Sequence, residues 1–282
     1  MRLYTNVSAM IAYENYNRNS NLYQQSLERL SSGLRINSAS DDPSGLAIAD
    51  KLRTQANSMS QGIKNANSAI SLTQIADKAM AEQSNIIDIV KSKLIQASTA
   101  TTSDEGREAI RKDIAKYLQQ LDNIASQTNY NGISLLQKDR NDDTLSDSLT
   151  FQVGGTSNDT ISMDGVRSNT VGLGLDTLKA LGTGALDQTT ASNNLTVLDE
   201  ALNRLNSFRS DFGSTQNQLE SSVRFMMTME TNLRASESVI RDVDYAKEVM
   251  QLNKLKIMME AGMYAISQAS KIQESMIRYL FR

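Results

Sequence analysis

The chain has 282 residues with no cysteine, histidine or tryptophan, and its net charge is only −3. Disulfides, thiol chemistry, histidine-dependent triads and histidine metal sites are therefore excluded. Basic and acidic residues are interspersed, so the composition predicts no binding to nucleic acid or to a membrane surface. Abundant Ser, Thr, Asn, Gln and Ala, with only 5% aromatic residues, favour long helices packed through small and aliphatic side chains.

The first 36 residues show a weak helical stripe of apolar side chains. A helix of this kind needs a partner, because most helical stability comes from packing an apolar face. Seven of the nine tyrosines lie before residue 24 or after residue 244, so the two chain ends are expected to share one environment. The stripe includes Val7, Ile11, Tyr16, Tyr23, Leu27, Leu30 and Leu34.

A second helix is predicted to begin at Pro43, the only proline, and to run to about Ala97. Asp42 is expected to cap it, since its carboxylate accepts from free backbone N–H groups and proline suits the first helical position. Apolar residues recur every seven positions, which is typical of a coiled-coil seam. This seam contains Leu52, Met59, Ala66, Thr73, Met80, Ile87 and Leu94, with Ala49, Ala56, Ile63 and Ile70 in the alternate position.

A third helix is expected after residue 102, with Thr102 and Glu105 as a capping box, and Asn131-Gly132 is predicted to stop it. Eight of the fourteen glycines lie between residues 132 and 190. Residues 149–153 and 160–163 read as the strands of a β-hairpin, within a loop region of about 139–190 that also contains a small helix.

Helical periodicity returns at Asn194, and a seven-residue repeat then runs to Ile240. The repeat slips near residues 241–246, and a new apolar stripe continues to the end. The predicted fold is mainly α: a long antiparallel helical coiled-coil rod made of N- and C-terminal segments, with a small β-hairpin/loop region in the middle. The two stripes are Leu198, Leu205, Phe212, Leu219, Met226, Leu233 and Ile240, and Tyr245, Val249, Leu252, Met259, Met263, Ile266, Ile277 and Leu280.

Several blocks, in order, resemble bacterial flagellin over nearly the whole chain. They are SSGLRINSASDD, GLAIAD, NANSAISLTQ, SQTNYNGISLL, FQVGG, LNSFRSDFGSTQNQLESSV and IRDVDYAKEV. The resemblance implies that residues 1–42 and 243–282 form the inner core of a filament. It also implies that residues 43–190 and 191–242 form a helical shell around that core, without an outer domain.

This resemblance implies a structural subunit that polymerises into the flagellar filament for swimming, with no enzyme activity and no cofactor. Implied partners are other copies of the chain, filament cap and hook-associated proteins, and an export chaperone on the C-terminal segment. Residues 1–18 lack a signal-like apolar core, so no cleavable signal is expected. The resemblance implies a location outside the cell and export by the flagellar type III apparatus. Both ends are expected to be disordered in the free monomer and to fold on assembly.

Three other functions remain open from the sequence. A hook–filament junction protein is the nearest alternative, because it shares the terminal signatures. A signalling coiled coil or secreted translocator would show similar heptads without matched blocks at both ends, and an enzyme is the weakest option. Stoichiometry distinguishes the first alternative, since a junction protein has few copies and a filament subunit has thousands.

Many flagellins carry QRVRELAV on the long N-terminal helix, and the flagellin-sensing Toll-like receptor binds this surface. The matching residues here are Asp88, Ile89, Val90, Lys91, Ser92, Lys93, Leu94 and Ile95. The family's first arginine falls on Ile89 and its glutamate on Ser92, while Lys91 supplies a point charge in place of a guanidinium fork. The resemblance therefore predicts weak or absent activation of that receptor.

Several polar clusters suggest chemistry but have simpler interpretations. Asn141, Asp142, Asp143 and Asp147 offer calcium ligands, yet they lack the spacing of an EF-hand and are expected to form a solvated loop. Asp242 and Asp244 are expected to be exposed carboxylates rather than an acid–base pair. Gly172-Leu173-Gly174 is expected to be a turn rather than a dinucleotide motif. O-glycosylation within residues 144–190 is a minor hypothesis from the resemblance.

Overall fold

A computed structural model describes residues 6–138 and 144–280, apart from the side chains of residues 276, 277, 279 and 280. The chain forms two compact units, which are considered separately. Unit 1 combines residues 1–56 with residues 231–282, and unit 2 comprises residues 57–230. The sequence-based division at residues 42 and 243 stays a prediction.

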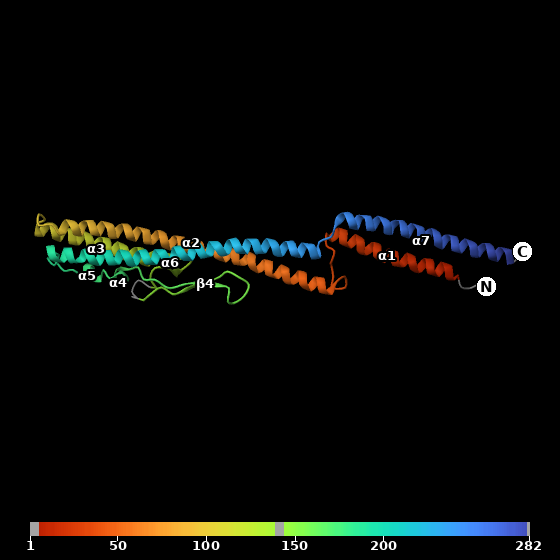
Figure 1. Cartoon of the computed structure of the whole chain (residues 1–282), viewed down its shortest axis with the longest axis horizontal. Coiled ribbons are helices and arrows are strands. Elements are labelled where there is room, and N and C mark those ends of the chain that lie inside the picture. The colour runs from red at the N-terminus through yellow and green to blue at the C-terminus, as the bar shows by residue number, and fades with distance from the viewer. Residues whose placement is uncertain (1–5, 139–143, 281–282) are drawn as a thin grey trace. The chain divides into compact units, whose positions relative to one another are not determined.

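The described part of the chain is mainly helical, as predicted, with two small two-stranded sheets. Figure 1 shows α1 running beside α7, and α2, α3 and α6 side by side in unit 2. The elements are α1 (Val7–Ser32), α2 (Pro43–Ala97), α3 (Asp104–Gln127), β1 (Asn129–Tyr130), β2 (Ile133–Ser134), β3 (Leu149–Gln152), β4 (Thr160–Met163), α4 (Thr170–Leu173), α5 (Asp176–Lys179), α6 (Gln188–Arg241) and α7 (Tyr245–Leu280).

The first helix ends earlier than the sequence predicts. Gly33 adopts a left-handed conformation with φ of 73°, and its N–H donates to the carbonyl of Arg29. A left-handed glycine at this position terminates a helix. Leu34 therefore does not continue the helical stripe; it instead forms an antiparallel bridge with Asp242 in unit 1.

The start and end of α2 are confirmed. The helix begins at Pro43 and ends at Ala97. The Asp42 carboxylate accepts a hydrogen bond of 2.9 Å from the N–H of Gly45, which is the predicted cap.

The predicted capping box of α3 is wrong by one residue. Ser103 caps the helix, and its hydroxyl accepts from the N–H of Gly106 at 3.2 Å. The Thr102 hydroxyl is committed elsewhere, because it donates to the carbonyl of Gln96 at 2.8 Å. The helix ends at Gln127, before the Asn-Gly pair.

The Asn131-Gly132 pair instead forms a hairpin turn. Both residues have positive φ, 51° and 81°, and they connect β1 to β2. Positive φ at both central residues is what a two-residue hairpin turn requires, and Asn-Gly supplies it at low cost. The predicted hairpin of β3 and β4 is also present, with Leu149 opposite Met163.

The last two helices begin with carboxylate caps. Asp187 accepts from the N–H of Thr190 at 2.6 Å, so α6 begins at Gln188, six residues before the predicted start. Asp244 accepts from the N–H of Lys247 at 3.1 Å at the start of α7. The predicted break between the two stripes falls at residues 242–244.

Two clusters of buried hydrophobic side chains form the core of unit 2. The larger joins α2, α3 and α6 with the segments around Leu135, Val166 and Leu175. The smaller consists of Ala66, Ala69, Leu219 and Met226, and Phe151, Val153 and Ile161 of the hairpin region pack against it. Asn65 also holds this hairpin, since its side-chain amide donates to the carbonyl of Gln152 at 3.1 Å.

Contacts between residues of α2 and α6 show that the two helices pack antiparallel in unit 2. Lys91 pairs with Asp199, and Arg209 pairs with Asp77 at 2.9 Å. Towards the other end, a Cβ placed on Gly62 would lie 2.8 Å from the sulfur of Met226.

Candidate assembly surfaces

The α1–α7 pair in unit 1 is a defined antiparallel packing. Ser26, which is buried, donates a hydrogen bond to the Glu248 carboxylate at one end. Near the middle, a Cβ on Gly262 would lie 3.6 Å from the Cβ of Tyr16. At the far end, the amide of Asn6 donates to the carbonyl of Ala269 at 3.0 Å. These contacts fix one register between the two helices.

Unit 1 buries few large apolar side chains. Among the described residues, the buried hydrophobic ones in this unit are Ile36, Ala49, Ala56 and Leu255. Both hydrophobic clusters of buried residues described above lie in unit 2. The contacts within unit 1 therefore leave much of its apolar surface uncovered.

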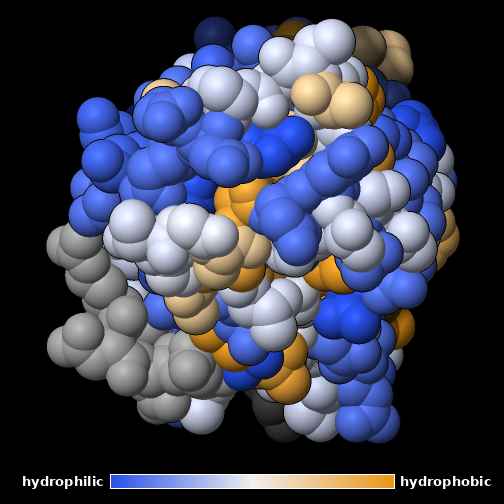
Figure 2. All heavy atoms as spheres, turned by 90° about the vertical axis from the view of Figure 1, so that its left-hand side faces the viewer, coloured by the Kyte–Doolittle hydropathy of each residue, from blue (hydrophilic) through white to orange (hydrophobic). Residues whose placement is uncertain are grey.

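Large hydrophobic side chains are correspondingly exposed along α1 and α7, and the exposed fraction of Tyr264 reaches 74%. Exposed apolar surface that extends along an element marks a site of protein association. These side chains are Val7, Met10, Ile11, Tyr13, Leu22, Leu27, Tyr245, Val249, Met250, Ile257, Met258, Met263, Tyr264 and Ile272. By contrast, the end of unit 2 seen in Figure 2 is mainly hydrophilic, with small separated hydrophobic areas.

The predicted filament-core residues whose side chains are described divide into two groups. Half-buried are Tyr16, Tyr23, Leu30, Leu34, Leu252, Met259 and Ile266. Exposed are Val7, Ile11, Leu27, Tyr245, Val249 and Met263. The side chains of Ile277 and Leu280 lie outside the described part of the structure.

Sequence reasoning missed an exposed row on α7. Met250, Ile257 and Tyr264 are seven residues apart and all strongly exposed. The seven-residue spacing was available in the sequence, but the row competes with the stripe that includes Leu252, Met259 and Ile266. Only the packing of α1 decides which of the two rows is covered.

The predicted seam residues are fully buried in the middle of unit 2 and half-buried elsewhere. Buried are Ile87, Leu94, Leu198, Leu205, Phe212, Leu219 and Met226. Half-buried are Leu52, Met59, Ile63, Ile70, Leu233 and Ile240. Ile63 and Ile70 pack at the edge of the smaller cluster, and the second buried row of α2 contains Ala69, Ala76, Gln83, Val90 and Ala97 instead.

The 88–95 segment lies on α2 in unit 2. Val90 and Leu94 are buried in the core. Lys91 forms an ion pair with Asp199, and Lys93 forms one with Asp113 at 3.3 Å. The exposed residues of the segment are Asp88, Ile89, Ser92 and Ile95. Both lysines of the segment are thus held by carboxylates of neighbouring helices.

The polar clusters named from the sequence have structural partners where they are described. Asp147 pairs with Lys138 at 3.1 Å, Asp242 accepts from the Ser238 hydroxyl at 2.5 Å, and Asp244 caps α7. Asn141, Asp142 and Asp143 lie outside the described residues. Gly174 is the left-handed C-cap of α4, with φ of 80°, so the predicted turn is a helix end.

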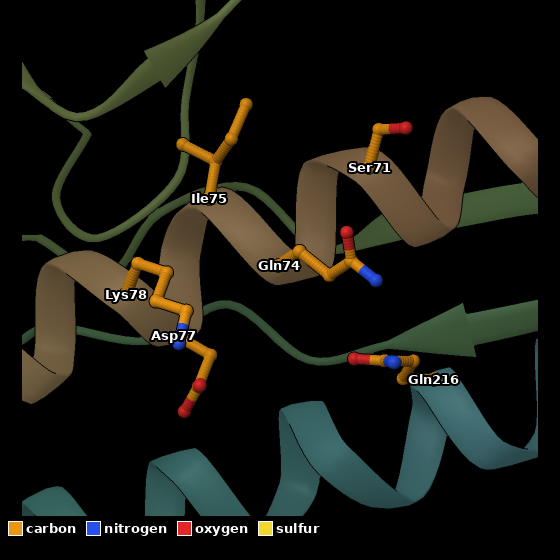
Figure 3. Close-up of a pocket in the computed structure, with 6 residues that line it drawn as sticks. All are labelled: Ser71, Gln74, Ile75, Asp77, Lys78 and Gln216. Atoms are coloured by element: carbon orange, nitrogen blue, oxygen red, sulfur yellow. The ribbon is translucent and has the colours of Figure 1, made fainter.

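A groove in unit 2 is lined by five residues of α2 and by Gln216 of α6, all drawn in Figure 3; the α2 residues are Ser71, Gln74, Ile75, Asp77 and Lys78. Gln74 and Gln216 come from the two facing helices, Asp77 points towards α6, and Ser71 and Ile75 point to the other side of α2. Asp77 is already paired with Arg209. Among the described residues, no group of acidic side chains is placed to hold a metal ion, and none of the helices is long and apolar enough to cross a membrane.

Two family models match the chain. The bacterial flagellin N-terminal helical region matches residues 3–141, and the bacterial flagellin C-terminal helical region matches residues 195–280. The chain is 33% identical to a flagellin of Halalkalibacterium halodurans, with 98% of each chain covered. It is 32% identical to a flagellin of Bacillus subtilis, with 99% and 100% covered. It is also 32% identical to a flagellar filament 33 kDa core protein of Treponema phagedenis, with 98% of each covered.

Solved structures show the same type of fold. The crystal structure of Bacillus cereus flagellin has a TM-score of 0.50 and 26% identity, covering 62% of this chain and 94% of that one. A putative flagellar hook-associated protein from Vibrio parahaemolyticus has a TM-score of 0.58 at 11% identity, covering 71% and 99%. The latter likeness concerns the fold alone.

Proposed function

Because the chain belongs to the bacterial flagellin family and is a subunit of the flagellar filament, we propose that the exposed apolar faces of α1 and α7 drive its polymerisation. The single observation that supports this proposal is the exposure of large apolar side chains along both helices of a unit that has little core of its own. Burying such faces against further copies removes apolar area from water, which favours association. In this proposal the rows on α1 and α7 belong to the filament core, and residues 43–242 belong to the surrounding shell.

Folding on assembly completes this proposal. In the free monomer, the apolar area buried between α1 and α7 is small compared with the entropy cost of ordering both segments. Stacking of subunits adds the missing buried area, so α1 and α7 become ordered helices in the filament. Amide hydrogen exchange is expected to be fast in both segments of the monomer and slow in the polymer.

Deletion of either segment tests the assembly role. Variants lacking residues 1–36 or residues 243–282 are expected to remain soluble and helical, because the hydrophobic clusters of buried residues lie within residues 57–230. They are expected not to elongate filament seeds, as judged by sedimentation and electron microscopy. Filaments of normal morphology from either variant would refute the proposal.

The same apolar face of α7 is also proposed to bind the export chaperone, the filament cap and the hook-associated proteins. An export chaperone that covers α7 before assembly prevents premature polymerisation, and the filament cap and hook-associated proteins contact terminal helices of the same kind. Co-purification of the chaperone with the full chain, and its loss on deletion of residues 243–282, tests the first of these contacts. Secretion that stops when the flagellar export apparatus is inactivated, with an uncleaved N-terminus on the filament protein, tests the export route.

Flagellins are structural proteins, and we assign this chain no catalytic step. The described carboxylates that were candidates for chemistry cap helices or form hydrogen bonds and ion pairs. No observation favours a hook–filament junction protein. Counting copies of the chain in isolated flagella separates the two roles, because thousands of copies per filament are expected and a few at the junction would contradict the assignment.

Weak activation of the flagellin-sensing Toll-like receptor is also proposed. The ion pairs of Lys91 and Lys93 within unit 2 support it, because a receptor must compete with Asp199 and Asp113 for these two cations. Ile89, an exposed residue of the segment, offers no donor to a receptor carboxylate. A reporter-cell titration with purified monomer is expected to give a potency at least tenfold below that of a flagellin carrying QRVRELAV. Equal potency would disprove the proposal.

A further inference from the structure

The buried seam of α2 contains a polar residue that is bonded across the core. One row of buried residues on α2 has alternating spacings of three and four: Ala66, Ala69, Thr73, Ala76, Met80, Gln83, Ile87, Val90, Leu94 and Ala97. Thr73 satisfies its hydroxyl within α2 by donating to the carbonyl of Ile70 at 2.9 Å. Gln83 reaches out of its helix, and its side chain is fully buried.

Both donors of the Gln83 amide are used. Its nitrogen donates to the carbonyl of Leu121 in α3 at 3.2 Å and to the carbonyl of Ser168 at 3.0 Å. Because both partners are carbonyl acceptors, the side-chain atom that faces them must be the amide nitrogen, and the other terminal atom of Gln83 is the amide oxygen. That oxygen has no hydrogen-bond partner among the described residues.

Ser168 carries the complementary unpaired group. Its backbone is fully used, because its N–H donates to the carbonyl of Leu136 at 3.0 Å and its carbonyl accepts from Gln83. Its side chain is also completely buried, and the hydroxyl oxygen has no partner among the described residues. An amide acceptor and a hydroxyl donor thus belong to two residues that are already joined by a direct hydrogen bond.

We propose that Gln83 and Ser168 form a binding site for one ordered water molecule inside unit 2. Water both donates and accepts, so a single molecule donates to the Gln83 oxygen and accepts from the Ser168 hydroxyl. A cation would leave the hydroxyl proton unsatisfied, and an anion would be repelled by the amide oxygen. Without such a ligand both groups would bear the full cost of desolvation, which buried polar groups in native proteins seldom do.

The water adds a link at a point where three elements meet. The segment that begins at Ser168 is also held by Asp122 of α3, which accepts from the N–H of Thr170 at 2.7 Å. Asn169 caps α4 by accepting from the N–H of Gly172 at 2.8 Å. The hydrated Gln83 therefore fixes the position of this segment on α2 and α3 by directional bonds, which an apolar residue on the seam would not provide.

The direction in which Ser168→Ala shifts the Tm of the full chain tests the water site. If water binds the hydroxyl, Ser168→Ala removes a satisfied hydrogen bond, and the Tm of unit 2 is expected to fall by about 2–4 °C. If the hydroxyl is unpartnered, the same change removes an uncompensated polar group, and the Tm stays constant or rises. The latter result would overturn the proposal.

Water relaxation dispersion provides a second readout that does not depend on stability. The wild-type monomer is expected to hold one more long-lived internal water than Ser168→Ala. Thr73→Val is the matched control, since it removes a buried seam hydroxyl that is bonded within its own helix, and its water count is expected to equal that of the wild type. If Ser168→Ala does not fold, a wild-type structure that resolves ordered waters decides. A water within hydrogen-bond distance of both atoms supports the site, and a direct bond between the Ser168 hydroxyl and the Gln83 oxygen refutes it.

Discussion

The side-chain amide of Asn6 donates a hydrogen bond to the carbonyl oxygen of Ala269, with 3.0 Å between the nitrogen and the oxygen. The other end of the same amide accepts from the N–H of Ala9 at 3.0 Å and caps α1. One side chain therefore both starts the first helix and fixes its register on the last one. The register of a helix pair in an assembly core decides which apolar rows face other copies.

Two substitutions separate these roles of Asn6. Asn6→Asp keeps an oxygen to cap α1 but cannot donate to Ala269, whereas Asn6→Ala loses both bonds. Loss of a cap costs about 1 kcal/mol, so Asn6→Ala is expected to raise the free subunit concentration in equilibrium with filaments about fivefold relative to Asn6→Asp. Sedimentation of filaments at equilibrium measures it. Equal free subunit concentrations for the two variants would mean that the Asn6 cap does not contribute to filament stability.

A charge in unit 2 is expected to act differently from a charge on α7. Leu219 is completely buried in the smaller cluster, so Leu219→Asp places an unpaired carboxylate in an apolar site and destabilises the monomer by several kcal/mol. Ile266 is half-buried on a helix expected to order only on assembly, so Ile266→Asp leaves the monomer melt almost unchanged and blocks seeded growth. Thermal melts followed by sedimentation distinguish the two. Equal loss of monomer stability would contradict the distinction.

The contact between α2 and the hairpin region depends on a missing side chain. A Cβ on Gly62 would lie 2.8 Å from both the carbonyl oxygen of Val153 and the sulfur of Met226. Gly62→Ala must displace both of them, and overpacking of this kind costs about 1–3 kcal/mol. The matched control is Gly213→Ala in α6, where a Cβ meets nothing within 4 Å and the helix gains about 0.5–1 kcal/mol. Opposite shifts of Tm are therefore expected, and a neutral Gly62→Ala would show that the hairpin region can move away without cost.

Local signals in the sequence predicted the helices well where one residue type determines the backbone. Asp42 and Pro43 determine the start of α2, and both are used as predicted. The sequence does not determine the start of α3, because Thr102 and Ser103 are both good caps. The hydrogen bond from Thr102 back to Gln96 at the end of α2 leaves Ser103 as the cap. The apolar stripe predicts a helix that continues past Gly33, although a glycine after a polar run is a typical terminator and ends α1 here.

The pattern of apolar residues predicted the principal row of each seam but not its partner row. The row from Leu198 to Met226 is buried because every position is large and apolar. The partner row of α2 consists mainly of alanines and includes Gln83, so it is less hydrophobic than the row with Ile63 and Ile70. The apolar pattern therefore favours the row with the two isoleucines. The surface of α7 that stays exposed depends on which of its faces packs against α1. The sequence of one helix alone does not determine that contact.

Acid is expected to weaken unit 2 through Glu108. The Arg111 guanidinium donates to both carboxylate oxygens of Glu108, at 2.9 and 2.8 Å, and the N–H of Gly184 donates to one of them at 3.2 Å. These bonds, led by the one from Arg111, lower the pKa of Glu108 from 4.5 to about 2. Arg111 also donates to the carbonyl of Leu181, so the pair holds the loop before α6 against α3.

The direction of the pH effect follows from the lowered pKa. The ionised carboxylate is favoured in the folded state, so its contribution to stability is complete above the unfolded value near 4.5 and is lost as the pH falls towards about 2. Wild type is therefore expected to melt at a higher temperature than Glu108→Gln at about pH 6. The difference is expected to shrink as the pH falls below about 4.5 and to be lost as it falls through about 2. Because both proteins share the lowered pKa values of Asp41, Asp159 and Asp187, the difference between their melting curves isolates Glu108. A difference in Tm that stays constant from about pH 6 to pH 2 would assign the loss to packing rather than to charge.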